Sequence, residues 1–70
     1  MELNVYEQAI IRLLKIARRP LTTTQIAAKL KISWETAKKY LEILHNKQLI
    51  SMDKESNKIS WKINITSFIN

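Results

Sequence analysis

The segment from Thr22 to Leu41 constrains the fold of this 70-residue chain more than any other part of the sequence. Thr22 can cap a short helix, and Gln25 stands three residues later, where its side chain completes a capping box. Ser33 can cap a second helix that begins after only a tight turn. Apolar residues recur along both helices at the spacing of one buried face. The segment therefore predicts two helices that pack together, over about residues 23–30 and 34–47.

A longer helix is expected before this segment, from about Val5 to Arg18. Asn4 and Glu7 form a second capping box at its start, and Pro20 ends it. At about 100° per residue, its apolar side chains cover roughly half of the circumference, whereas a single small core needs a stripe nearer 100°. The excess apolar surface predicts that a second copy of the chain packs against this helix.

A β-hairpin is expected after the helices. Ile50–Met52 has the composition of a short strand, and Asp53–Asn57 is a polar stretch that fits the loop after it. From Lys58 to Ile65, polar and apolar residues alternate, which is typical of a half-buried strand. The hairpin is therefore expected over about residues 50–65. The apolar tail over residues 66–70 is expected to add to the contact between two copies.

The chain contains no glycine, so other residues must stand where glycine is commonest. The residue that follows a helix often adopts a left-handed conformation, which glycine reaches without steric cost. Lys31 and Gln48 stand at two such positions. We expect both to adopt positive φ angles at a modest cost in free energy.

Residues 1–70 suffice for one domain, whose small core leaves a monomer only marginally stable. The absence of cysteine excludes a disulfide, and a single histidine argues against structural zinc, so self-association is the remaining means of stabilisation. The first residues lack the apolar core of a secretory signal, and no apolar run is long enough to cross a membrane. We therefore expect a soluble cytoplasmic protein.

The net charge of +6 is unevenly distributed, with +7 between residues 12 and 39. A pI near 9.9, with the positive charge concentrated around the predicted helix pair, suits a polyanionic partner. An ordinary solvated basic surface is the alternative explanation.

Residues 20–63 resemble the winged helix-turn-helix domains of small prokaryotic transcription regulators, and archaeal, viral and plasmid regulators are the nearest match. The resemblance rests on the run T-x-x-Q-I-A-x-x-L-x-I-S-x-x-T-A-x-x-x-L-x-x-L-x-x-x-x-L-I, followed by a hairpin. It implies an α+β, mostly α fold with three helices and a hairpin wing. In that family the third helix reads the major groove, the wing contacts the backbone or the adjacent minor groove, and flanking helices often form a dimer. The resemblance places the reading helix at residues 34–47 and the wing tip at residues 53–58.

The predicted DNA-binding residues lie at helix starts and on the wing. Lys38 and Lys39 project outward early on the reading helix, where phosphates and guanine edges would lie. Glu35 can accept a hydrogen bond from cytosine or pair with one of these lysines. Thr36 can contact DNA or support the Ser33 cap. The other members are three threonines before the second helix, which suit phosphate, the first residue of the reading helix and two wing lysines: Thr22, Thr23, Thr24, Trp34, Lys54 and Lys58.

Neither the tryptophans nor the single histidine of the chain indicates a catalytic or metal-binding site. Trp34 borders the core, which favours packing against the second helix over stacking on DNA. Trp61 alternates with two isoleucines and is expected in the core. His45 is a single histidine on a polar helix face, so no metal or catalytic role is expected. Without a glycine-rich phosphate loop, a histidine cluster or a plausible carboxylate pair, we expect no enzyme activity, no cofactor and no small-molecule ligand.

The expected function is sequence-specific binding of double-stranded DNA by a homodimeric transcription regulator associated with the nucleoid. Dimer symmetry would set two reading helices about 34 Å apart to match a palindromic site. The first alternative is a winged-helix module that binds proteins in a replication or transcription complex, for which loss of the basic helix face is expected. The second is RNA or single-strand binding, which favours exposed aromatic side chains, and only Trp34 and Tyr40 would serve.

Overall fold

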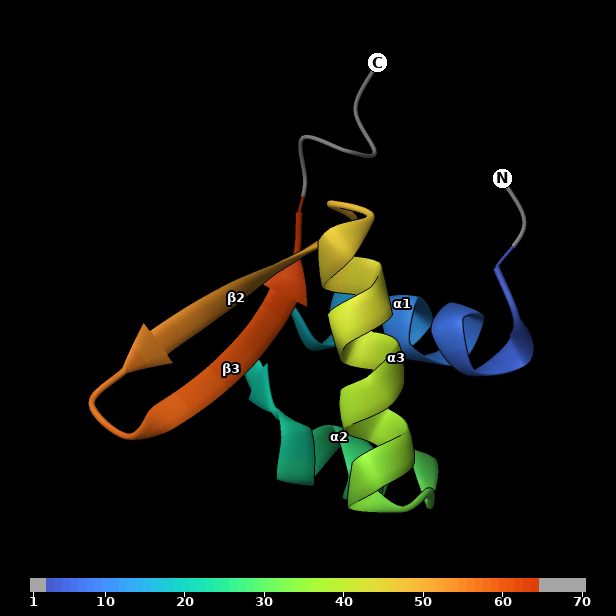
Figure 1. Cartoon of the computed structure of the whole chain (residues 1–70), viewed down its shortest axis with the longest axis horizontal. Helices are drawn as coiled ribbons and strands as arrows, with labels where there is room; N and C mark the ends of the chain where they lie inside the picture. Colours follow the sequence, from blue (N-terminus) through green and yellow to red (C-terminus); the bar gives the residue numbers. More distant parts are fainter. Residues whose placement is uncertain (1–2, 65–70) are drawn as a thin grey trace.

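The computed structural model describes residues 3–64 and arranges them as three helices and a three-stranded sheet. Figure 1 shows α1 behind α3, α2 beneath them, and a long hairpin that projects to one side. The tail over residues 66–70, and Ile65 at the predicted end of the hairpin, lie outside the described residues. The elements in chain order are α1 (Val5–Ala17), β1 (Leu21–Thr22), α2 (Thr23–Leu30), α3 (Trp34–Asn46), β2 (Ile50–Glu55) and β3 (Lys58–Ile63).

The helices begin at the capping residues that the sequence predicts. In α1, the Asn4 side chain accepts a hydrogen bond from the Glu7 amide at 2.8 Å, and the Glu7 carboxylate accepts one from the Asn4 amide at 2.9 Å. Thr22 and Gln25 form the same reciprocal pair at the start of α2, at 3.1 and 2.9 Å. Ser33 caps α3. These bonds satisfy amides that have no partner within their own helix.

Four non-glycine residues adopt left-handed backbone conformations, and they set where elements end. Lys31 and Gln48 do so as predicted, with φ of 58° and 64°. Arg18 has a φ of 57°, so α1 ends at Ala17, one residue earlier than predicted. Ser56 has the same φ in the hairpin turn. The predicted helix over residues 34–47 likewise ends one residue earlier, and Lys47 becomes its C-cap.

The sheet corrects two predictions. The sequence predicts strands only in the hairpin, but Leu21–Thr22 forms a further strand, β1, which pairs antiparallel with β3 and sets Leu21 opposite Trp61. The expected loop over residues 53–57 is only the two-residue turn Ser56–Asn57, because residues 53–55 continue β2 and pair with β3. Polar side chains do not oppose strand formation here, since this end of the hairpin is solvent-exposed on both faces. The sheet order is β1-β3-β2.

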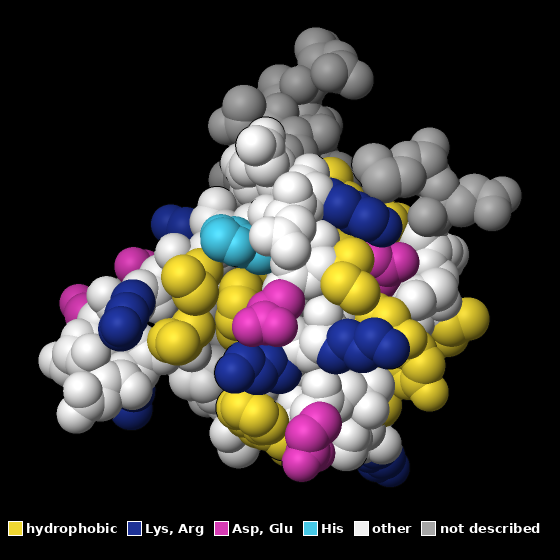
Figure 2. All heavy atoms as spheres, viewed as in Figure 1, with side chains coloured by type: hydrophobic (Ala, Val, Ile, Leu, Met, Phe, Trp, Pro, Cys, Tyr) yellow, Lys and Arg dark blue, Asp and Glu magenta, His cyan; other side chains and the backbone are white. Residues whose placement is uncertain are grey.

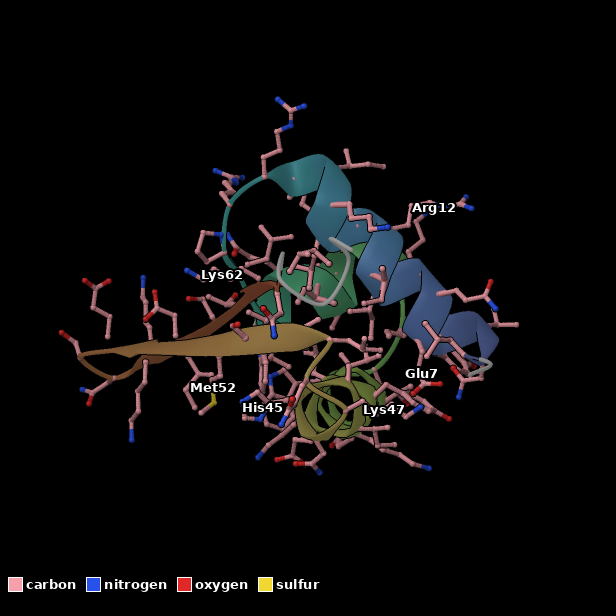
Figure 3. All side chains as sticks on the ribbon, turned by 90° about the horizontal axis from the view of Figure 1, so that it is seen from above. Glu7, Arg12, His45, Lys47, Met52 and Lys62 are labelled. Carbon is pink, nitrogen blue, oxygen red and sulfur yellow. The ribbon has the colours of Figure 1, made fainter. Side chains whose placement is uncertain are left out.

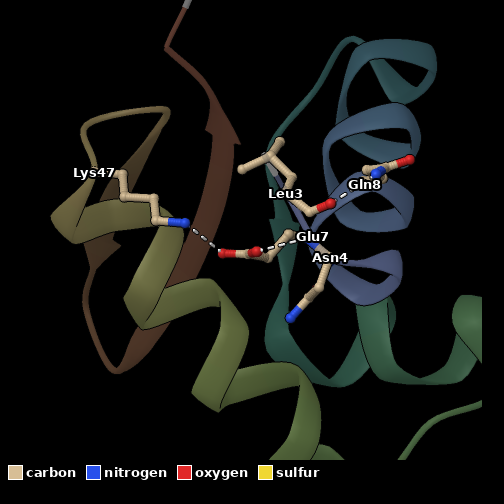
Figure 4. Close-up of polar contacts among 5 residues, drawn as sticks. All are labelled: Leu3, Asn4, Glu7, Gln8 and Lys47. Carbon is tan, nitrogen blue, oxygen red and sulfur yellow. Dashed lines mark hydrogen bonds and ion pairs between the residues drawn. The ribbon is translucent and has the colours of Figure 1, made fainter. Parts of the chain in front are cut away.

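The core lies between the inner faces of the three helices and the base of the hairpin. Trp61 is 4% exposed, which confirms its predicted place in the core. Glu7 is the one buried acidic residue of the described chain, and its carboxylate oxygen lies 3.0 Å from Lys47 Nζ at the end of α3 (Figure 4). The apolar core residues are Ile10, Ile11, Leu14, Leu21, Ile26, Ala27, Ala37, Leu41, Leu44, Ile50 and Trp61.

The outer face of α1 retains the apolar excess noted in the sequence. Val5 is 77% exposed and Ile16 is 72% exposed, although both are large apolar side chains. A shallow groove of about 420 Å³ runs beside them between α1 and Leu30 of α2. This face of α1 has no partner among residues 3–64.

Candidate nucleic-acid interface

The threonines at the start of α2 have different roles. Thr22 caps the helix, and Thr24 is exposed to solvent. Thr23 is buried, and its hydroxyl oxygen accepts a hydrogen bond from Trp61 Nε1 at 2.9 Å. Thr22 and Thr24 are therefore the members of the predicted set that a phosphate can reach, together with the free amides of the first turn. Thr23 instead ties α2 to β3 and fixes how the helix start sits beside the hairpin.

The start of α3 is held by a small hydrogen-bond network. Ser33 Oγ accepts from the Thr36 amide at 3.1 Å and donates to Thr36 Oγ1 at 2.8 Å. The Thr36 hydroxyl therefore supports the cap and retains its own hydrogen for a further acceptor. Glu35 is exposed, and it forms no ion pair with Lys38 or Lys39 within the described residues. The pairing that the sequence left open is thus absent, and the Glu35 carboxylate faces solvent.

Lys38 and Lys39 are both exposed on the outer face of α3, as predicted. The Lys38 ammonium lies 5.2 Å from the centre of the Trp34 ring, and that of Lys39 lies 5.3 Å from the Tyr40 ring. Both distances are within the range of cation–π attraction. Trp34 is 46% exposed, more than the predicted packing against α2 would leave. The two lysines therefore extend over neighbouring aromatic rings on the surface of α3.

The hairpin presents its two predicted lysines on opposite faces. Side chains alternate along a strand, so Lys54 shares a face with Met52, while Lys58 and Lys62 share the other. Figure 3 shows Met52 on the side of His45 and α3, and Lys62 on the opposite side. Lys54 therefore faces the same side as Met52, whereas Lys58, on the other face of the hairpin, lines the groove beside the starts of α2 and α3.

A groove of about 480 Å³ separates the hairpin from the starts of α2 and α3. It brings together six of the ten predicted residues, of which Thr23 is buried and the other five are exposed or partly exposed, and buried Trp61 also lines it. His45 lies beside it with its ring 6.0 Å from that of Trp61, in an edge contact. Residues 3–64 contain no cluster of side chains suited to a metal ion. The groove is lined by Thr22, Thr23, Thr24, Gln25, Trp34, Lys38, Asn57, Lys58, Ile59 and Trp61.

The charge of this surface differs from the expectation. Positive charge was expected around the reading helix, but lysines and acidic residues balance along α3 and the hairpin tip. Figure 2 shows lysines beside acidic side chains on the face of α3. Counting charges by element, rather than over the window 12–39, would have revealed this balance. The charged residues of α3 and the hairpin tip are Glu35, Lys38, Lys39, Glu42, Asp53, Lys54, Glu55 and Lys58.

Comparison with known proteins supports a single fold family. Residues 7–64 match the family described as winged helix-turn-helix. ZitR from Lactococcus lactis, solved in complex with DNA, is 27% identical with a TM-score of 0.82, and the match covers 96% of this chain and 47% of that chain. A double mutant of ZitR is 30% identical, with the same TM-score and coverage. No curated protein sequence matches the chain.

A more distant relative shows the fold alone. Reduced HlyU from Vibrio cholerae is 18% identical with a TM-score of 0.75, and the match covers 86% of this chain and 61% of that chain. The present chain spans about half the length of the ZitR chains that it matches. The predicted winged helix fold, three helices followed by a β-hairpin wing, is confirmed.

Proposed function

The chain belongs to the winged helix-turn-helix family, and we propose that it binds double-stranded DNA sequence-specifically as a homodimeric transcription regulator. In this proposal α3 enters the major groove, while the start of α2 and the hairpin contact the phosphate backbone on either side. ZitR supports the proposal because it resembles this chain and has been solved in complex with DNA. The proposed role is binding without catalysis, and the proposed place of action is the nucleoid.

The pair of exposed lysines on a rigidly anchored helix carries the proposal. Ala37 and Leu41 are completely buried, so the inner face of α3 is fixed in the core. Lys38 and Lys39 stand on the outer face, one and two residues after Ala37, and neither forms an ion pair within the described chain. Lysine ammonium groups can donate hydrogen bonds to guanine edges or to phosphates. A helix held in this way presents them in a fixed register along the groove.

The hairpin contributes to the proposed interface mainly through electrostatics. Lys54 faces the side of α3, and Lys58 lines the groove beside the helix starts together with Thr24 and Trp34. The three arginines of the chain all lie before residue 20, so none is available on the hairpin to enter a minor groove. We therefore assign the hairpin to the phosphate backbone and base selection to α3.

The exposed apolar strip of α1 supports the homodimer. Val5 and Ile16 stand one above the other on the surface beside the groove that ends at Leu30. An exposed apolar strip of this kind is typical of an interface between chains. If two copies associate through this strip, their α3 helices can face successive turns of the major groove, about 34 Å apart.

The proposal can be tested with one double variant and a control that removes the same charge elsewhere. A preferred duplex is first selected from a random library with the parent protein, and binding is then measured for the variant K38A/K39A. Its affinity for the selected duplex should fall at least about tenfold, because each base contact is worth about 1–3 kcal/mol. The control K29A/K31A removes the same charge at the end of α2, outside the candidate interface, and should keep the preference for the selected duplex.

The thermal melt of each variant separates binding from folding. Exposed substitutions typically change stability by less than about 0.5 kcal/mol, so both variants should melt close to the parent. If K38A/K39A melts like the parent and still binds the selected duplex as tightly, α3 is not the reading helix.

A protein-binding module is the second candidate, and one observation favours it. The surface of α3 and the hairpin tip has no net charge, and it exposes the apolar side chains of Trp34, Met52 and Ile59. A protein partner would use this apolar surface rather than the lysines. Under this alternative the library selection would yield no preferred duplex.

A further inference from the structure

The positive charge of the chain is concentrated outside the proposed reading helix and the hairpin tip. Seven cationic residues lie on α1, the link after it, the end of α2 and β3, and no acidic residue of the described chain lies among them. The net charge of the described chain comes from this group, because Glu7 pairs with Lys47 and the charges of α3 and the hairpin tip balance. The group consists of Arg12, Lys15, Arg18, Arg19, Lys29, Lys31 and Lys62.

All three arginines of the protein belong to this group. Arg12 lies on the exposed side of α1, and Arg18 and Arg19 follow the end of that helix. Figure 3 places Arg12 and Lys62 on the side of the molecule away from His45 and α3. A guanidinium group presents a planar fork of donors that fits phosphate oxygens, so arginine is well suited to phosphate recognition.

A groove of about 600 Å³ lies within this surface, between the end of α1 and β3. Lys15, Arg18 and Arg19 border it on one side, and Lys62 borders it on the other. The three arginines and Lys62 form no ion pair within the described chain. Arg18, Arg19 and Lys62 therefore border one groove without an ion-pair partner among the described residues, and an anionic partner would compensate their charge.

We propose that this basic back surface, defined by Arg18, Arg19 and Lys62, binds the phosphate backbone of a second DNA duplex while α3 holds the first. A duplex carries one charge per about 1.7 Å of its axis, so more than one phosphate can reach the cations around this groove. This inference takes from the proposed function only that duplex DNA is the partner.

An acidic peptide is the rival occupant, because exposed Pro20 and half-buried Ile63 leave apolar surface in the lining of this groove beside buried Leu14. Two adjacent arginines favour the closely spaced phosphates of a duplex. Poly-L-glutamate is the probe that distinguishes the two occupants.

The test compares two double variants that remove the same charge. R18A/R19A changes the back surface, and K29A/K31A is the matched control, because each pair contains one residue with a left-handed backbone. A bead-bound 24-base-pair duplex is mixed with protein and a fluorescent duplex, and capture of the second duplex is measured at 50 mM salt. R18A/R19A should lower this capture at least about tenfold, and the control should retain it. Thermal melts confirm that both variants are folded.

Titrations with a single duplex separate this surface from α3. K38A/K39A should lose its preference for the selected duplex but still bind any duplex at low salt. This remaining binding should vanish when the substitutions R18A/R19A are combined with K38A/K39A in one protein. R18A/R19A alone should keep the preference for the selected duplex. The slope of log affinity against log salt concentration should become shallower by about two, because each lost phosphate contact changes it by roughly 0.9.

Three results would overturn the inference. The first is capture of the second duplex by R18A/R19A at the parent level, which would assign bridging to the two reading helices of a dimer. The second is an equal loss in K29A/K31A, which would show a diffuse charge effect. The third is loss of binding to poly-L-glutamate in R18A/R19A with unchanged duplex binding, which would identify an acidic protein as the partner. None of these results depends on whether α3 selects a sequence.

Discussion

The ion pair between Glu7 and Lys47 provides the sharpest test of how the two ends of the fold are held together. It joins the first turn of α1 to the C-cap of α3, with the carboxylate and ammonium 3.0 Å apart. The Glu7 side chain is 6% exposed, whereas that of Lys47 is 29% exposed. The hydrogen bond from the Asn4 amide lowers the pKa of Glu7 below its ordinary 4.5, burial opposes this shift, and Lys47 lowers the pKa further.

Glu7→Gln should destabilise the protein by about 1–3 kcal/mol at pH 7. Glutamine can keep the bond from the Asn4 amide, since it also serves at this position of a capping box. Its amide NH₂ group, however, would face the Lys47 ammonium with no acceptor, and an unsatisfied buried donor costs about 1–3 kcal/mol. Lys47 itself is partly hydrated, so the larger cost of stranding a fully buried charge does not arise.

Removing the lysine of the pair should lower the free energy of unfolding more than removing the carboxylate. Lys47→Met leaves the buried Glu7 carboxylate with the Asn4 amide as its one remaining partner within the described chain. For a domain of this size, about 1 kcal/mol corresponds to a shift in melting temperature of about 4–8 °C. Melting followed by circular dichroism should therefore rank the proteins as parent, then Glu7→Gln, then Lys47→Met.

The dependence on pH distinguishes the ion pair from simple packing. Because the pKa of Glu7 is lower in the folded than in the unfolded protein, its contribution is present above about pH 4.5 and is lost as the pH falls through the folded value. The gap in melting temperature between the parent and Glu7→Gln should thus narrow from pH 7 to pH 3. Equal melting temperatures at pH 7, or a gap that persists unchanged at pH 3, would refute the reasoning.

Three further predictions follow from the packing and the surface. Leu41→Ala should lower the free energy of unfolding by about 2–5 kcal/mol, because Leu41 is completely buried. A thermal melt should then show most of the protein unfolded already near room temperature. Lys54→Ala and Lys58→Ala should each lower the salt slope of DNA binding by about one without changing sequence preference. Gel filtration with light scattering should show a dimer at tens of micromolar; an 8.2 kDa species would contradict the α1 interface.

The local signals of this sequence predicted local structure well. Asn4, Thr22 and Ser33 each cap the helix that they were expected to cap, because capping depends on residues within one turn. Lys31 and Gln48 adopt the left-handed conformations required by their positions. These features need no information about the rest of the fold.

Pairings between distant residues could not be predicted in this way. The strand Leu21–Thr22 is too short to give an alternating pattern, and it exists because β3 lies beside it. Glu7 and Lys47 are 40 residues apart, and nothing near either residue indicates the other. Thr23 was assigned to phosphate contact because threonines suit helix starts, but its bond to Trp61 becomes visible only when the sheet is placed against α2.

The candidate site was predicted in part for the same reason. The outward faces of Lys38 and Lys39 follow from helical spacing alone. The division of the wing lysines between two faces depends on the exact register of the hairpin, which the expected five-residue loop had left undefined. The distribution of charge over the whole surface likewise depends on which elements lie side by side.

The most direct test of the central claim is a titration of the ¹⁵N-labelled protein with a selected duplex, followed through its backbone amide shifts. At 200 mM salt, where weak backbone contacts are screened, the largest shifts should lie on residues 34–40 of α3, on the first turn of α2 and at Lys54. Amides at Arg18 and Arg19 should respond only at low salt, when the back surface is also occupied. Large shifts that leave the amides of Lys38 and Lys39 unchanged would show that this protein does not read DNA with α3.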